Sequence, residues 1–82
     1  MLNEIQMEKL QAIGEGVKSE FERAFAKFGA FNTAHEGWAI LREEVDELWD
    51  EVKSKDRSLE AMREEATQVA AMAIRFIYDL CD

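Results

Sequence analysis

The sequence predicts an all-α protein, and two observations support that class. The chain has 82 residues with no proline and only four glycines, while residues that favour helices are plentiful. Its hydrophobic residues, 48% of the total, recur mostly at spacings of three and four, which is the period of one helix face. A chain of this length has room for one domain, so we expect residues 1–82 to form a single unit.

The first helix is expected to run from Leu2 to about Phe28. Gly14 and Gly16 interrupt it, and each costs about 1 kcal/mol relative to Ala in a helix interior, so a bend or a break is expected there. Gly29 suits the positive-φ residue that closes many helices. The apolar stripe of this helix comprises Leu2, Ile5, Leu10, Ile13, Val17, Phe21, Ala24, Phe25 and Phe28.

A helical hairpin is expected to follow. Thr33, with Glu36 three residues later, has the form of a capping box and predicts a helix from Ala34 to about Lys53. Ser58 is the expected N-cap of a third helix, and the short polar loop before it makes the two helices antiparallel neighbours. The expected core stripes are Trp38, Leu41, Val45, Leu48 and Val52 on the second helix and Met62, Ala66, Val69, Ala73, Phe76 and Leu80 on the third.

The charge balance restricts the class of partner. Ten Lys and Arg against eighteen Asp and Glu give a net charge of −8, which repels a nucleic-acid polymer. Carboxylates are the ligands that hard divalent cations such as Mg²⁺ require. Cys81 is the single cysteine, so no disulfide within the chain is expected, and no apolar run is long enough for a membrane span. We therefore expect a cytoplasmic protein that does not bind membranes.

Two pairs of polar residues are expected to converge on one side of the hairpin. Glu44 and Glu47 lie about 80° and 140° to one side of the second helix's apolar stripe, at about 100° per residue. Glu65 and Gln68 have nearly the same offsets on the third helix. In an antiparallel pair, equal offsets bring both sets to the same side. Three carboxylates crowded there would repel one another unless a cation lay among them, whereas the alternative is an ordinary solvated acidic surface.

The arrangement Glu44-x-x-Glu47, seventeen residues, then Glu65-x-x-Gln68 resembles the metal motif of the MazG-like nucleoside triphosphate pyrophosphohydrolases. The likeness covers roughly residues 31–80, including the turn Phe31-Asn32-Thr33-Ala34, and is greatest for the small single-domain members, including phage-borne ones. The resemblance implies a Mg²⁺ site, or Mn²⁺ in its place, held by Glu44, Glu47, Glu65 and Gln68, with the three glutamates as the catalytic residues.

One position departs from the family pattern. The family has Asp where this chain has Gln68, so the site loses one negative charge, and a neutral amide oxygen is a weaker ligand for Mg²⁺. Asp79, on the same face of the third helix, is a candidate for restoring that charge. The alternatives are reduced activity or a catalytically silent, nucleotide-binding member of the family.

The resemblance implies cleavage of a (deoxy)nucleoside triphosphate between the α and β phosphates, which gives a monophosphate and pyrophosphate. Glu43 or Glu64, beside the ligands, are candidates for orienting the attacking water. Lys53, Lys55, Arg57 and Arg75 are candidates for phosphate contacts, although Arg75 with Asp79 also has the spacing of an ordinary helix ion pair. Candidate contacts to the base are Asn32, His35, Trp38 and Phe31, with core packing as the alternative for both aromatic residues.

An oligomer is also expected, because a domain this small buries only about 60% of its unfolded surface. In the resembled family two chains pair their helical hairpins into a four-helix bundle, so a homodimer or a tetramer is expected here. Trp49 and Ile40 lie outside the main stripe of the second helix and add apolar surface. A different class of function stays open at this point: a small acidic helical module that binds another protein.

Overall fold

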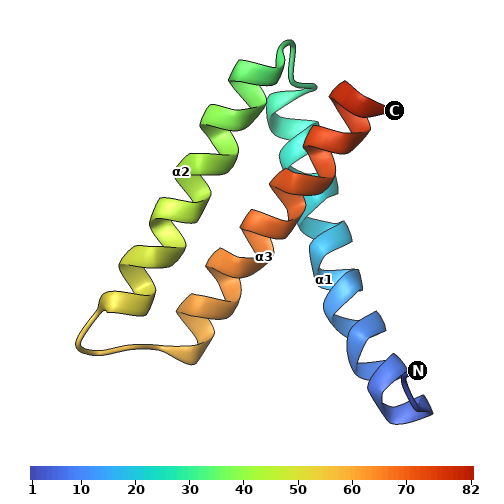
Figure 1. Ribbon diagram of the computed structural model, residues 1–82, viewed down its shortest axis with the longest axis vertical. Coiled ribbons are helices and arrows are strands. Elements are labelled where there is room, and N and C mark those ends of the chain that lie inside the picture. Colours follow the sequence, from blue (N-terminus) through green and yellow to red (C-terminus); the bar gives the residue numbers. More distant parts are fainter.

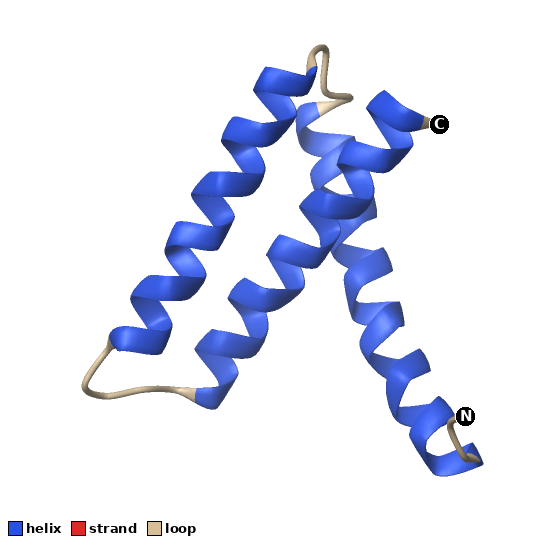
Figure 2. Ribbon diagram, viewed as in Figure 1, coloured by secondary structure: helices blue, strands red, loops and turns tan.

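A computed structural model describes all residues, 1–82, and is entirely helical (Figures 1 and 2). The chain forms α1 (Glu4–Phe28), α2 (Ala34–Lys53) and α3 (Leu59–Phe76), and α3 continues into a π-helical turn, η1 (Ile77–Cys81). The predicted all-α class, with its long first helix and its hairpin, is confirmed. None of these helices combines the length and apolarity needed to cross a bilayer.

Side-chain caps fix where each helix begins. Asn3 and Gln6 form a full capping box at the start of α1, a feature that the sequence analysis did not identify. Thr33 Oγ1 accepts from the Glu36 N–H at 3.1 Å, but the Glu36 carboxylate accepts from the Asn32 N–H instead of returning to Thr33. The expected box at α2 is therefore only half formed. The expected cap from Ser58 is present at the start of α3.

The glycines of α1 behave differently from one another. The helix runs without interruption through Gly14 and Gly16, so the expected break is absent. Gly29 ends the helix with φ 74° and ψ −163°, a combination that residues with a Cβ rarely adopt. Its N–H donates to the Phe25 carbonyl at 2.8 Å. The expected helix end at Phe28 is thus confirmed.

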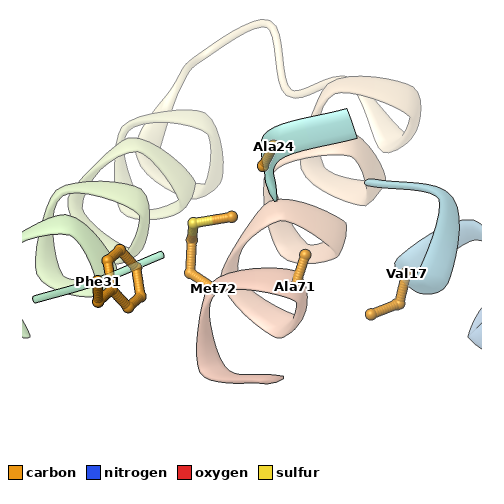
Figure 3. Close-up of a cluster of buried hydrophobic side chains, with 5 residues drawn as sticks. All are labelled: Val17, Ala24, Phe31, Ala71 and Met72. Atoms are coloured by element: carbon orange, nitrogen blue, oxygen red, sulfur yellow. The ribbon is translucent and has the colours of Figure 1, made fainter. Parts of the chain in front are cut away.

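α3 is the central helix, because it packs on α2 along one side and on α1 along the other. The core lies where the three helices meet, at the C-terminal half of α1 and the end of α3. It also takes in the loop of residues 29–33. Figure 3 shows its five buried side chains, which are Val17, Ala24, Phe31, Ala71 and Met72.

The packing face of α2 is rotated from the expected stripe. Trp38 is 55% exposed and Val45 is 42% exposed, so the expectation that both belong to the core is wrong. Gly37 is buried instead, and a Cβ added there would lie 2.8 Å from Phe76 Cδ2. Ile40, which the sequence placed outside the stripe, packs against the core. The absence of a side chain at Gly37 lets α2 approach α3 at a position that a hydrophobic pattern cannot mark.

α3 also departs from its expected stripe, because it has neighbours on two sides. Ala71, Met72 and Arg75 are its buried residues, whereas Ala66, expected in the core, is exposed. A helix covered on two sides has no single apolar stripe, so a prediction based on one face misses the second contact.

The first half of α1 contributes no buried residue to the core. Residues 1–16 are all exposed, although this segment carries four of the nine residues of the predicted apolar stripe. Figure 1 shows α1 diverging from α3 toward its N-terminus. The core contacts of α1 therefore begin only at Val17.

Candidate metal centre

Three carboxylates meet between α2 and α3. Glu44 and Glu47, one turn apart on α2, and Glu65 on α3 each place an oxygen within 4.8 Å of the other two. Glu44 and Glu65 are half-buried. One oxygen of each, Glu44 Oε2 and Glu65 Oε2, is buried without a hydrogen-bond partner. Buried polar atoms are normally paired, so these two oxygens require an explanation.

The proton affinities of these carboxyls reflect their crowding. Burial, followed by the charges of Glu47 and Glu65, raises the pKa of Glu44 to about 7. Burial and the neighbouring Glu47 carboxylate also raise the pKa of Glu65 above its usual value. The cluster thus holds charge at a cost, which either protons or a cation can relieve. Carboxylate oxygens are the donors that Mg²⁺ prefers, so this set of residues fits that ion.

A pocket of about 420 Å³ adjoins the cluster and shares Glu44 with it. It lies between α1, α2 and α3, and both apolar and charged residues line it. Four carboxylates and two guanidinium groups line it, so an anionic ligand would meet net negative charge unless a cation accompanied it. The thirteen lining residues are Glu20, Arg23, Ala24, Phe28, Ala30, Phe31, Glu36, Ile40, Glu43, Glu44, Gln68, Met72 and Arg75.

Arg75 and Asp79 hold the loop that forms one wall of this pocket. Arg75 is only 3% exposed, its Nη2 donates to the Gly29 carbonyl at 2.7 Å, and its guanidinium lies 4.2 Å from the Phe31 ring centroid. Asp79 Oδ2 accepts from the Phe31 N–H at 2.8 Å. The two residues do not form the i, i+4 ion pair weighed from the sequence. Asp79 lies outside the carboxylate cluster, so it does not compensate for Gln68.

The other residues suggested from the sequence fall in three places. Gln68 lines the pocket together with Glu44. Asn32, His35 and Trp38 are exposed and lie outside its lining, and the Asn32 amide donates to Glu36. Lys53 is near the other end of α2, where it pairs with Asp50 at 3.4 Å.

The basic loop after α2 also has a local role. Arg57 Nε donates to the Val52 carbonyl at 3.0 Å and so caps the end of α2. This contact satisfies one of the last carbonyls of the helix. Of the four basic residues suggested for phosphate contacts, Arg75 alone reaches the pocket.

Glu20 and Arg23 are pocket residues that the sequence analysis missed. They form a bidentate ion pair on α1, with Nη2 to Oε1 at 2.6 Å, and the hydrogen bonds from Arg23 hold the pKa of Glu20 below its usual value. Their i, i+3 spacing signals a pair on one helix face. No local pattern shows that this face meets α2 and α3, so the pair could not be placed at the pocket from sequence.

Comparison of the chain with protein-family models, curated proteins and solved structures finds no match, so its function must be argued from the site itself.

Proposed function

We propose that the chain is a Mg²⁺-dependent nucleoside triphosphate pyrophosphohydrolase. The observation that carries this proposal is the cluster of Glu44, Glu47 and Glu65, whose oxygens lie within 4.8 Å of one another and include two buried atoms without partners. Such a cluster is stabilised by a cation that accepts several oxygen ligands. The resemblance of the motif to MazG-like enzymes supports the choice of reaction.

The three glutamates would hold the ion, with the amide oxygen of Gln68 as a further candidate ligand. Bound Mg²⁺ would neutralise charge on the phosphates and lower the pKa of an attacking water. Mn²⁺ prefers similar oxygen ligands and should substitute for it.

The remaining chemistry falls to the residues of the pocket. Glu43 lines the pocket beside Glu44 but is not in the cluster, so it is free to accept the proton of the attacking water. The water oxygen bonds to the α phosphorus as the bond to the bridging oxygen breaks, and pyrophosphate leaves. Arg23 lines the pocket with an exposed side chain, and the part of its guanidinium that Glu20 does not occupy is available to the leaving phosphates, whereas Arg75 is buried in its contacts to the loop. Phe28, Ile40 and Met72 supply apolar wall for the base and sugar.

A homodimer through the helical hairpin forms part of the proposal. Trp38, Val45 and Trp49 are exposed at helical spacing on α2, as are Ile74 and Ile77 on α3. Helical rotation puts both stripes on the face of the hairpin turned away from α1. Pairing two such faces would make a four-helix bundle and cover side chains that are costly to leave in water. It would leave the carboxylate cluster and its pocket on the opposite side.

Pyrophosphate release from a panel of ribo- and deoxynucleoside triphosphates, with Mg²⁺ or with chelator, tests the activity. We expect metal-dependent release by the native chain and its loss in Glu47→Gln, which keeps the shape of the side chain but removes its charge. Glu60→Gln, an exposed carboxylate at the start of α3, is the matched control and should leave activity unchanged.

Two outcomes would point elsewhere. Activity that appears only in Gln68→Asp would mean that the native chain binds nucleotide but has lost catalysis through Gln68. If neither the native chain nor Gln68→Asp releases pyrophosphate, the second candidate function is favoured, which is a module that binds another protein. The exposed Trp38 and Trp49 are the observation that favours this alternative.

A further inference from the structure

The pocket beside the carboxylate cluster has two ends, and α2 runs from one to the other. Glu36, Ile40, Glu43 and Glu44 all line it, and their spacing along the helix puts them on one face. Glu44 belongs to the cluster. Glu36 lies eight residues earlier, about 12 Å along the helix at roughly 1.5 Å per residue. A nucleotide whose phosphates lie at Glu44, as the proposed function requires, therefore extends its base toward Glu36.

Apolar side chains at the Glu36 end suit a flat aromatic ligand. Phe28 is the last residue of α1, and the loop of residues 29–33 joins it to the start of α2 at the same end of the molecule (Figure 1). Phe28 lines the pocket and is 65% exposed, and Ile40 lines the pocket as well. An exposed aromatic ring in a pocket wall can stack on a nucleobase. The Glu36 end thus offers a surface for a base.

The Glu36 carboxylate has unused capacity to accept hydrogen bonds. It accepts from the backbone N–H and the side-chain amide of Asn32 at 3.3 and 3.4 Å, and both distances are longer than usual for a hydrogen bond. It forms no ion pair, although Arg23 and Arg75 line the same pocket. An ionised carboxylate has about four acceptor sites on its two oxygens. Each oxygen of Glu36 can therefore take a further N–H donor from a ligand.

Among the common bases, guanine has the edge that best matches such a carboxylate. Its N1–H and its N2 amino group are neighbouring donors, so they can bind the two oxygens of one carboxylate in parallel. Adenine and cytosine have an amino group beside an unprotonated ring nitrogen, which would face a carboxylate oxygen with no proton between them. Thymine and uracil have one N–H between two carbonyl oxygens, and a carboxylate repels those oxygens.

We propose, on the basis of the function above, that this end of the pocket is a guanine subsite. Both oxygens of Glu36 accept from the Watson–Crick edge of the base, and Phe28 stacks on its face. The preferred substrate is then a guanine nucleoside triphosphate. Asn32, His35 and Trp38, which the sequence suggested as base contacts, lie outside the pocket lining, so Glu36 determines the selectivity.

Removing one amino group from the substrate tests the subsite. Deoxyinosine triphosphate differs from dGTP only in lacking the N2 amino group. We expect the native chain to release pyrophosphate from dGTP with a kcat/KM at least about tenfold higher, because the analogue leaves one charge-assisted hydrogen bond to Glu36 unmade. Equal kcat/KM values for the two substrates would overturn the guanine subsite and leave the proposed hydrolysis standing.

Glu36→Gln tests the residue itself. The amide keeps one acceptor oxygen and adds an NH2 donor, and this combination matches the amino group and ring nitrogen of adenine. The ratio of kcat/KM for dGTP to that for dATP should therefore fall by about tenfold or more. Partial unfolding cannot produce this change, because both substrates are measured on one protein. Glu22→Gln, exposed on α1 outside the pocket lining, is the matched control and should leave the ratio unchanged. An unchanged ratio in Glu36→Gln would contradict the assignment.

If no triphosphate is cleaved, nucleosides decide the question. Guanosine and inosine carry no phosphate and need no metal, so their dissociation constants can be measured by NMR titration in chelator. We expect guanosine to bind about tenfold more tightly and to shift the signals of Phe28 and Glu36, and we expect Glu36→Gln to remove the difference. Such binding without pyrophosphate release would reject the hydrolysis and support the subsite. Equal binding of the two nucleosides, or binding of neither, would overturn the guanine subsite.

Discussion

Two regions of the continuous helix formed by α3 and η1 contain charged side chains, and they differ in whether the chain supplies partners for those charges. Near the C-terminal end, Arg75 and Asp79 each contact the loop before α2 through a hydrogen bond. Two turns or more earlier, Glu65 meets Glu44 and Glu47, and only like charges surround it. The charges of Arg75 and Asp79 are compensated by hydrogen-bond partners inside the chain. The charges of the glutamate cluster have no such partners and need a proton or a cation from solution.

The largest effect is expected at the end where partners are present. Arg75→Ala removes the donor to the Gly29 carbonyl and the group stacked on Phe31. The free energy of unfolding should therefore fall by about 3 kcal/mol. Denaturant titration measures it. Arg23→Ala is the matched control, because its ion pair is exposed and should be worth under about 1 kcal/mol. Equal losses in the two variants would mean that the loop contacts contribute little.

A smaller loss is expected where α2 approaches α3 most closely. A methyl group at Gly37 would overlap the Phe76 ring, so Gly37→Ala should cost about 1 to 2 kcal/mol after the gain in helix propensity. Gly14→Ala, with open space around it, should leave the folded monomer more stable by up to about 1 kcal/mol. The melting temperature measures whether each substitution lowers or raises stability. A gain at both positions would show that Phe76 moves aside freely.

Removing a charge from the carboxylate cluster should raise the stability of the fold, in contrast to Arg75→Ala and Gly37→Ala. Without metal at pH 8, Glu44→Gln removes one charge from the cluster and should raise stability by about 1 kcal/mol, once solvent screening of a half-exposed group is allowed for. If the proposed site binds Mg²⁺, the variant should also lose most of the stabilisation that the ion would give the native chain at millimolar concentration. Differential scanning calorimetry with chelator and with Mg²⁺ compares them. A Mg²⁺-induced shift that persists in Glu44→Gln would place the ion elsewhere.

The smallest effect is the pH dependence of the metal-free chain. Because the pKa of Glu44 rises from 4.5 unfolded to about 7 folded, the folded state holds a proton that the unfolded state has released between those values. The stabilising contribution is complete below pH 4.5 and is lost as the pH rises through 7. Melting temperature in chelator should therefore fall from pH 5 to pH 8. Glu44→Gln should flatten that slope, and an equal slope in both proteins would assign it to other groups.

The sequence predicted the helices well, because caps and polar turns are local signals. Ala34, Lys53 and Phe28 were placed correctly as helix ends, with Thr33 and Gly29 as the residues that set them. The antiparallel hairpin followed from its short loop. Equal offsets from two apolar stripes were enough to expect Glu44, Glu47 and Glu65 on one side of it, and the structure brings their oxygens together.

What the sequence could not provide were features that depend on a third helix. The buried face of α2 is set by Gly37, which has no hydrophobic signal, so Trp38 was wrongly placed in the core. The position of α1 decides which second side of α3 is covered, and it brings Arg23 to the pocket. Periodicity shows that a helix has an apolar face, but it does not show where along that face the neighbouring helix stops.

The contacts of Arg75 and Asp79 also bear on the order of folding. They join residues 46 and 48 positions apart, whereas the α2–α3 hairpin closes through a loop of only a few residues. Loop-closure entropy favours the hairpin as the early structure, with α1 docking afterwards. Loss of the Arg75 contact would then accelerate unfolding and leave the refolding rate almost unchanged. Arg75, through its contact with Gly29, would thus control the lifetime of the folded state.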